Sequence, residues 1–316
     1  MVKAWAYILI MRGIAAAVAL VACIAVVPDQ ATGFAPTPPI RSSTKKNVQF
    51  PISPPLDITA TSVGERRQLI SVNVLNDGID ESNDAPGFRI NPPYALAYVL
   101  FLGFAYIRQS AEVEGASMEA LNQYIADPLN PGWNELFITI FNLLGLYAAP
   151  LACLLMPGSK NQKLPAAPFV LGSMFGGYGA LGIYTSTREP NPTEVSKSDL
   201  GWFTANVLEN KLFNYFILLL CASTYVTSGA LGAFVSDPVG LIKGYGDMFS
   251  ETALVSASSV DFVILTLTAA ALVPEDLSRR GYKGDIAPEL IATSTVLLPG
   301  LGAALYCALR PSLEEE

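Results

Sequence analysis

The chain has no histidine among its 316 residues. This excludes catalysis by a Ser-His-Asp triad and any haem, iron or zinc site that uses an imidazole ligand. Charged residues are also scarce. They make up 15% of the chain, whereas about a quarter of a soluble domain is charged. Hydrophobic residues reach 51% and the mean hydropathy is +0.40. These deficits favour a membrane protein over a soluble enzyme.

Cysteine is rare, and its spacing has no chemical signature. Cys23 lies near the N-terminus, and Cys153, Cys221 and Cys307 each lie in an apolar run without a Cys-x-x-Cys pair. We expect buried, inert thiols and no disulfide framework. Phosphate-binding loops, dinucleotide fingerprints and nucleophile elbows are missing as well. The sequence therefore predicts no catalytic residue, no metal site and no cofactor.

Two targeting segments stand at the front of the chain. Residues 1–33 have the basic start and the apolar run of a secretory signal peptide, with Met11 as an alternative start to Met1. Residues 34–56 are basic, rich in Ser, Thr and Pro, and free of acidic side chains, which is typical of a transit peptide. The alternative is an ordinary secreted precursor with a basic tail.

The junction of these two segments has a motif of its own. Ala31-Thr32-Gly33 is followed directly by Phe34-Ala35-Pro36. This junction resembles the bipartite plastid presequence of diatoms and related algae, in which a Phe opens the transit peptide, although Gly33 replaces the usual Ala. The resemblance implies a plastid protein, and with the apolar runs described below we expect it in the thylakoid or the inner envelope.

The rest of the chain divides into a lead-in, an apolar domain and a tail. Residues 57–92 are polar and acidic, residues 93–311 contain long uncharged runs, and residues 312–316 end in three glutamates. The formal net charge of the whole chain is −8, and the basic targeting segments leave the remainder more acidic still. An acidic chain disfavours nucleic acid as a partner, so the lipid bilayer is the partner we expect.

Residues 93–311 predict an all-α, polytopic membrane domain. A spanning helix needs about 20 apolar residues. Four runs meet this without a charge: 136–156, 168–187, 212–235 and 290–309. Run 252–273 is interrupted only by Asp261, and run 94–107 is shorter. We predict six transmembrane helices, with five as the alternative. In the six-helix arrangement Lys and Arg are equally numerous on the two sides, so the positive-inside rule gives no orientation.

The six predicted helices divide into two halves that share landmarks. The last helix of each half starts near a Pro and ends on Tyr-x-x-x-Arg, as Tyr184 to Arg188 and Tyr306 to Arg310. Two three-helix repeats in tandem must have opposite orientations in the membrane, as in many transporters. The pattern is thus consistent with an inverted repeat. The alternative is that unrelated membrane helices share similar ends.

Asp261 is the leading candidate for an intramembrane polar site. A carboxylate at mid-membrane costs at least about 2.5–3.5 kcal/mol on insertion scales unless it is paired, hydrated or protonated. Asp261 could be a site for a proton or a cation. The alternative is a structural role, in which Asp261 hydrogen-bonds two helices together. Asn142, in the second predicted helix, is expected to hydrogen-bond between helices.

Small residues and prolines indicate where helices pack or bend. Gly172, Gly176, Gly179 and Gly182 crowd the third predicted helix and should let another backbone approach closely. Pro150 and Pro299 lie inside predicted helices and are expected to break or bend them. The charged run 275–280 is interpreted as a solvated loop with local ion pairs rather than as a gate or docking patch.

The mature chain also carries features that match as a set. These are Trp133-Asn134-Glu135-Leu136-Phe137, Phe141-Asn142-Leu143-Leu144-Gly145, the segment 165–170, Asp261 with Arg279-Arg280, and Arg310-Pro311. Together they resemble a family of multi-pass proteins of cyanobacteria and chloroplasts. The resemblance implies a photosynthetic membrane but no particular activity.

Our leading hypothesis for function is a non-enzymatic assembly, stability or scaffold factor of a photosynthetic membrane complex. The alternative is a small-solute or proton-coupled transporter that uses Asp261. A membrane enzyme acting on a lipid or carotenoid is the third hypothesis. It would use Asp261 or Glu275 as an acid or base, but such work needs positioned partners that the sequence does not name.

Overall fold

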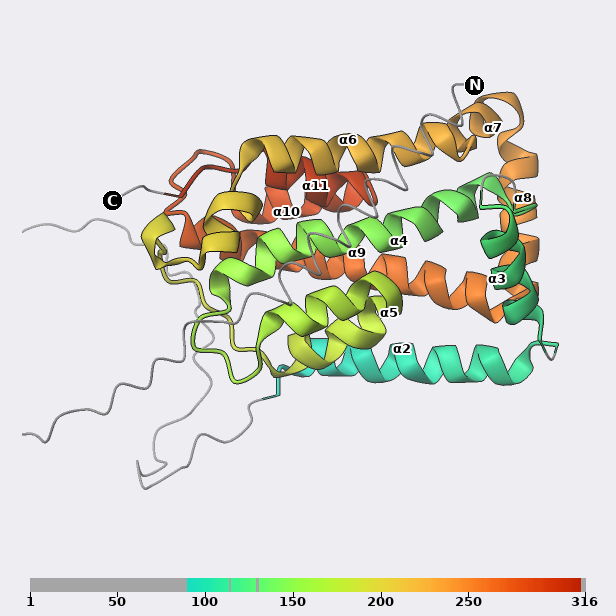
Figure 1. The fold of residues 1–316 in the computed structure, drawn as a ribbon, viewed down its shortest axis with the longest axis horizontal. Coiled ribbons are helices and arrows are strands. Elements are labelled where there is room, and N and C mark those ends of the chain that lie inside the picture. Colours follow the sequence, from blue (N-terminus) through green and yellow to red (C-terminus); the bar gives the residue numbers. More distant parts are fainter. Residues whose placement is uncertain (1–89, 114, 129–130, 314–316) are drawn as a thin grey trace, which may run out of the picture. The chain divides into compact units, whose positions relative to one another are not determined.

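The computed structural model describes residues 90–113, 115–128 and 131–313, and every regular element in these ranges is a helix (Figure 1). The predicted signal peptide (1–33) and transit peptide (34–56) lie outside the described residues. So do nearly all of the lead-in 57–92 and the last three residues of the tail. The all-α class predicted for residues 93–311 is confirmed.

Four helices run between two ends of the described domain: α2 (Pro92–Ala111), α4 (Glu135–Leu155), α6 (Lys211–Thr227) and α9 (Ala253–Arg279). At one end, the last residues of α4 and α9 meet, because Arg279 donates to the carbonyl oxygen of Leu154 at 2.6 Å. At the other, α2 ends where α9 begins, since Arg108 donates to Ser256 at 2.9 Å. We call the first the charged end, because Glu275, Asp276, Arg279 and Arg280 lie there.

The opposite end is covered by α3 (Ala116–Ala126) and α8 (Pro238–Glu251), and α7 (Ala230–Ser236) links α6 to α8. Aromatic packing joins this cover to α4, because the Tyr124 ring stacks on Trp133 with a centroid distance of 5.0 Å. We call this the covered end. The short helices η1 (Met156–Gly158), η2 (Lys197–Asp199) and η3 (Thr204–Leu208) connect the longer elements.

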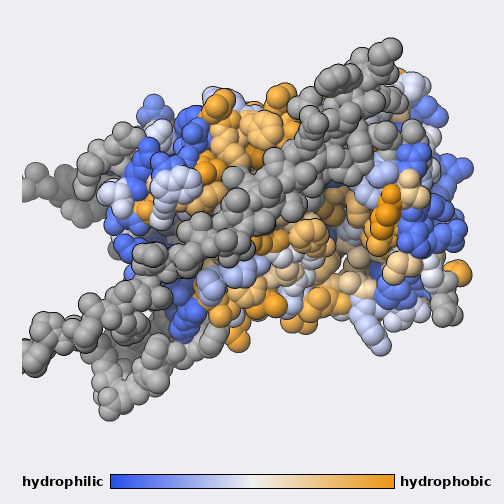
Figure 2. All heavy atoms as spheres, viewed as in Figure 1, coloured by the Kyte–Doolittle hydropathy of each residue, from blue (hydrophilic) through white to orange (hydrophobic). Residues whose placement is uncertain are grey.

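Three helices in the described part of the chain are long and apolar enough to cross a membrane. These are α4 with its following turn (Glu135–Gly158), α5 (Ala166–Thr187) and α9, and the pair α6 and α7, bent by 46°, adds a fourth candidate. On the face seen in Figure 2, hydrophobic residues gather between two hydrophilic ends. A membrane protein is therefore supported, whereas the predicted count of six transmembrane helices is not confirmed.

The helix α5 turns back on itself. Gly177 has φ 51° and ψ −136°, which no helix contains. The rings of Phe169 and Tyr184 stack with centroids 5.9 Å apart, whereas 15 residues of straight helix would separate them by about 22 Å. Gln162 and Glu189, on either side of α5, exchange two hydrogen bonds of 2.8 and 2.9 Å. We call residues 166–187 the first hairpin; both of its arms end at the charged end.

The predicted helix 290–309 is a second hairpin rather than one continuous helix. It consists of α10 (Pro288–Leu297) and α11 (Leu301–Leu309), separated at Pro299-Gly300, where Gly300 has φ 79°. A Cβ atom on Gly302 would collide with the backbone of Thr295, although seven residues of straight helix span about 10 Å. The chain therefore reverses at Pro299-Gly300, and Arg310 returns to the charged end.

The two halves of the chain share an order of elements. Each has a long helix, one or two helices at the covered end, a second long helix and then a hairpin. Because each hairpin begins and ends at the charged end, both halves start and finish at that end, and the two halves run in the same direction along the domain. The predicted inverted repeat is accordingly not confirmed. The physical reason is that its third helix returns to its starting end.

Prolines do not break either of the two long helices that contain one in their interior. The helix α4 continues through Pro150 to Leu155, and α9 continues through Pro274 to Arg279. A proline inside a helix removes one hydrogen bond and clashes with the preceding turn, but packing by neighbouring helices can hold the helix together. Among the prolines proposed as break points, Pro299 does coincide with a reversal of the chain.

Candidate functional site

The carboxylate of Asp261 lies at the tip of the first hairpin. It accepts a hydrogen bond of 2.6 Å from the backbone N–H of Tyr178, the first residue of the second arm. The first N–H groups of a helix have no partner within that helix, and an anion beside them is favoured by the helix dipole. Asp261, on the neighbouring helix α9, thus caps the second arm. Asp261 is only 8% exposed.

The turn at this tip requires glycine at position 177. Its φ of 51° lies in the left-handed region that other residues rarely adopt. In addition, a Cβ atom on Gly177 would overlap the carboxylate of Asp261. The Asp261 carboxylate can therefore approach the hairpin backbone closely only because residue 177 has no side chain.

The other glycines of α5 serve two contacts. Gly172 and Gly176 lie beside Ala180 of the opposite arm, so they let the two arms of the first hairpin pack together. Gly182 lies against the ring of Tyr98 on α2, and the carbonyl oxygen of Gly179 accepts a hydrogen bond of 3.2 Å from the Tyr98 hydroxyl. Close backbone approach is thus used within the hairpin and toward α2.

The tip of the second hairpin meets α9 at the residue after Asp261. A Cβ atom on Gly300 would contact Phe262 of α9 and Leu143 of α4. The hydroxyl of Tyr225 on α6 donates to the carbonyl oxygen of Pro299. Both hairpin tips therefore reach α9 at Asp261 and Phe262, about a third of the way along this helix of 27 residues.

Asn142 hydrogen-bonds toward the covered end rather than to either hairpin tip. Its carbonyl oxygen accepts a hydrogen bond of 3.0 Å from the hydroxyl of Tyr124 on α3. The partner is a helix of the covered end rather than another long helix. The structure thus does not bring Asn142 and Asp261, the two polar candidates, into one site.

The run 275–280 forms a buried ion-pair network, not the solvated loop expected from sequence. Glu275 pairs with Arg188, through a hydrogen bond of 2.9 Å and a second shorter one, and with Arg279 at 3.0 Å. Asp276 pairs with Arg280 at 2.8 Å and with Arg310 at 3.2 Å. Asp276 is fully buried and Arg279 is 1% exposed. The interpretation was wrong because α9 continues through Pro274 and other elements cover its end.

A third carboxylate completes this network. Glu209, which follows η3, accepts from Arg280 at 2.8 and 2.9 Å and from Arg310 at 3.0 Å. The Tyr306 hydroxyl donates to Asp276 at 2.8 Å. Burial by itself would lower the pKa of Arg280, but the carboxylates of Asp276 and Glu209 together outweigh burial and raise that pKa above its ordinary value. Burial also opposes the charge of Arg310, whose pKa is nevertheless raised because Asp276 and Glu209 are among the groups that favour the charged form.

Sequence reasoning missed this network although one signal for it was present. The two Tyr-x-x-x-Arg endings flank the two hairpins, and their arginines reach adjacent carboxylates, Arg188 to Glu275 and Arg310 to Asp276. The endings were noted as landmarks of a repeat. Their partners could not be assigned because a carboxylate 34 or 87 residues away is not identified by spacing.

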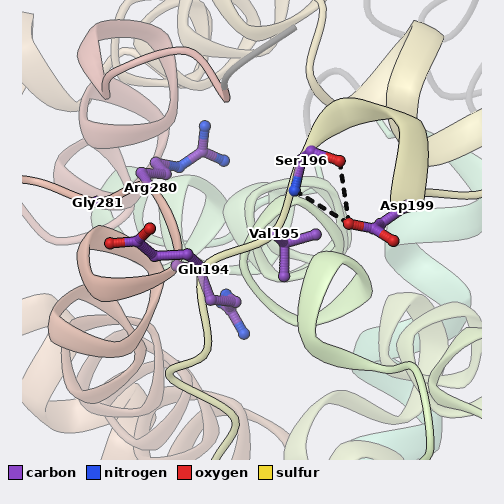
Figure 3. Close-up of a pocket in the computed structure, with 7 residues that line it drawn as sticks. Glu194, Val195, Ser196, Asp199, Arg280 and Gly281 are labelled. Carbon is purple, nitrogen blue, oxygen red and sulfur yellow. Dashed lines mark hydrogen bonds between the residues drawn. The ribbon is translucent and has the colours of Figure 1, made fainter. Parts of the chain in front are cut away.

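A polar pocket of about 190 Å³ opens beside this network (Figure 3). Glu194, Val195, Ser196, Asp199, Arg279, Arg280 and Gly281 line it. In Figure 3, Asp199 turns toward Ser196 and is hydrogen-bonded to it, while Glu194 lies on the opposite side. Both arginines already pair with carboxylates, so the pocket offers a ligand few uncommitted charges.

Within the described residues, no group of three or more His, Cys, Asp or Glu side chains is placed to hold a metal ion. Cys153, Cys221 and Cys307 are free and buried, as expected from their apolar surroundings. No protein-family model, curated protein or solved structure matches this chain. Function is therefore inferred from the geometry described above.

Proposed function

We propose that this protein is a non-enzymatic, multi-pass component of a photosynthetic plastid membrane that acts as an assembly, stability or scaffold factor. The observation that supports this proposal best is that each hairpin is fastened at its tip and at its base. The first is held by Asp261 at the tip and by Arg188 with Glu275 at the base. The second is held by Tyr225 at the tip and by Arg310 with Asp276 at the base.

These contacts at the tips and bases help to distinguish a rigid scaffold from a carrier that changes conformation. Alternating access requires one part of a carrier to rock or gate against another around the binding site. Here the parts most suited to such movement are tied to α9 by a buried ion-pair network, and removing one partner of a buried pair costs about 3–5 kcal/mol. A rigid body suits a scaffold better than a carrier.

We further propose a topology of four passes and two re-entrant hairpins on one side. The passes are α2, α4, α6 with α7, and α9. The helix α2 has 20 residues. Asn91, just before it, hydrogen-bonds to the base of the first hairpin, and Arg108, near its other end, hydrogen-bonds to the start of α9. The helix therefore extends from the charged end to the covered end. Its outward side chains are apolar, with Leu96 and Val99 both more than half exposed. The plastid address rests on the Phe34 junction described above.

The test is a native gel of mildly solubilised plastid membranes from cells that express the full-length precursor with a C-terminal tag. We expect the protein to migrate with a larger photosynthetic complex, and the Asp261→Asn variant to migrate with it. Cross-linking of intact membranes before solubilisation checks that detergent has not stripped partners away. Migration of the cross-linked protein only as a free monomer or dimer would refute the scaffold proposal.

A proton-coupled transporter that uses Asp261 is the second candidate. The observation in its favour is a buried carboxylate beside the break of a re-entrant hairpin, because discontinuous helices form the substrate and ion sites of many transporters. Purified protein in liposomes with an internal pH dye tests it. Dissipation of a pH gradient by wild-type protein, but not by Asp261→Asn, would favour the carrier; no difference between them and empty liposomes would dismiss proton movement.

A further inference from the structure

An apolar groove of about 500 Å³ lies beside the start of α6, away from the hairpin tips and from the polar pocket. Its lining comes from η3 and from the first turns of α6: Asn206, Val207, Asn210, Leu212, Phe213 and Phe216. The residues of η3 form a π-helix. Such turns are rare and are found frequently at functional sites. The groove is therefore a candidate ligand-binding site.

The groove continues into the apolar outer face of α6. Leu212, Phe216 and Leu219 follow one another at helical spacing on that face and are 78%, 40% and 65% exposed. Since α6 and α7 together are long and apolar enough to cross a membrane, this face looks onto the hydrocarbon of the bilayer. The most direct occupant of a groove open to that side is a lipid acyl chain.

The charges next to the groove indicate which headgroup suits it. Lys211 donates from its ammonium to the carbonyl oxygens of Ala308 and Arg310, so this cation is engaged inside the protein. The carboxylate of Glu209 is taken by Arg280 and Arg310. The lining itself has no charged residue. A phosphate headgroup would thus find no free cation among the residues that line the groove.

Two amides at the groove can recognise hydroxyl groups instead. Asn206 donates to the carbonyl oxygen of Trp202 at 2.8 Å, which leaves its own carbonyl oxygen as an acceptor. Asn210 caps α6 by accepting from Leu212 at 2.8 Å, which leaves its NH₂ group as a donor. We propose that this groove binds one acyl chain of a lipid whose headgroup is uncharged and bears hydroxyl groups, namely a glycolipid.

The test is native mass spectrometry of the purified full-length protein. The protein in detergent is offered an equal mixture of monogalactosyl diacylglycerol, phosphatidylcholine and phosphatidylglycerol with identical acyl chains. We expect one galactolipid to be retained in preference to phosphatidylcholine, whose headgroup has no hydroxyl group, by about tenfold, the ratio expected for two hydrogen bonds. Equal retention of the three lipids, or preference for phosphatidylglycerol, would overturn the headgroup assignment.

Three variants locate the bound lipid. Val207→Trp fills the groove and should abolish selective retention, whereas Leu219→Trp adds the same side chain on the same face of α6 outside the lining and should leave it unchanged. Asn206→Leu should reduce the preference for galactolipid without abolishing chain binding. The elution profile of each variant on gel filtration reports folding. If Val207→Trp elutes as wild-type protein and still retains one galactolipid selectively, or if a polypeptide occupies the groove, the proposal is wrong.

Discussion

The two hairpins have the same place in their halves of the chain but are stabilised at different points. The first reverses at a single glycine and is capped at its tip by the Asp261 carboxylate. The second reverses over Leu298 to Gly300 and is met at its tip by a neutral group, the Tyr225 hydroxyl. A carboxyl cap at one tip and a hydroxyl contact at the other predict unequal sensitivity to substitution.

At the bases of the hairpins, the second hairpin has the stronger set of ionic contacts. Arg188, after the first hairpin, pairs with one carboxylate, Glu275. Arg310, after the second, pairs with both Asp276 and Glu209, and Tyr306 adds a hydrogen bond to Asp276. The first hairpin thus depends more on its tip and the second more on its base. Two segments with matching sequence endings can therefore reach the same shape through different interactions.

The largest effect is expected at the base of the second hairpin. Asp276→Leu leaves Arg280 and Arg310 buried with one carboxylate fewer, and we expect a loss of about 3–5 kcal/mol in the free energy of unfolding. Thermal unfolding of purified protein in detergent measures it. Glu275→Leu is the matched control. Its side chain is 11% exposed, against 1% for Asp276, so it should cost less. A greater cost at Glu275 would reverse the proposed division between the bases.

The next largest effect is expected at the tip of the first hairpin. Gly177→Ala must hold a left-handed φ, which costs roughly 1–2 kcal/mol, and must also displace the Asp261 carboxylate. We therefore expect a total loss above that range, measured by the same thermal unfolding.

The double variant Gly177→Ala with Asp261→Ala separates the two parts of this cost. Removal of the carboxylate relieves the overlap but not the backbone strain, so the two losses should not add. Gly300→Ala, in the second hairpin, is the comparison, since it meets only the ends of the Leu143 and Phe262 side chains. Additive losses in the double variant would show that Asp261 does not press on the turn.

A smaller effect separates charge from hydrogen bonding at Asp261. Asp261→Asn keeps an oxygen that can accept from the Tyr178 N–H, so only the attraction to the helix dipole is lost, typically 0.3–1 kcal/mol. Asp261→Leu leaves that N–H unpaired, at about 1–3 kcal/mol. Unfolding midpoints of the two variants should therefore differ in this order. Equal midpoints would mean that the cap contributes nothing to the first hairpin.

Sequence patterns predicted the helical class and several of the segments correctly, and the reason they failed on topology is specific. A hairpin of two short apolar helices has the same length and hydropathy as one spanning helix, as residues 168–187 and 290–309 illustrate. Gly177 and Pro299-Gly300 lie near the middle of these runs. From sequence, the glycines around position 177 are expected to be packing sites and Pro299 to be a break or bend. Whether a bend is slight or a full reversal depends on contacts with Asp261, Leu143 and Phe262.

The smallest predicted effect tests the neutral tip contact of the second hairpin. Tyr225→Phe removes the hydroxyl that donates to the carbonyl oxygen of Pro299 while keeping the ring. A net hydrogen bond is worth about 0.5–1.5 kcal/mol, and this one is partly open to its surroundings, so we expect the lower part of that range. Tyr98→Phe, on α2, is the matched control for the first hairpin, because it removes the hydroxyl that donates to the carbonyl oxygen of Gly179. Thermal unfolding of both variants should show losses smaller than that of Asp261→Leu. If Tyr225→Phe were instead as costly as Asp276→Leu, the second hairpin would depend on its tip as much as on its base, and the contrast between the hairpins would be lost.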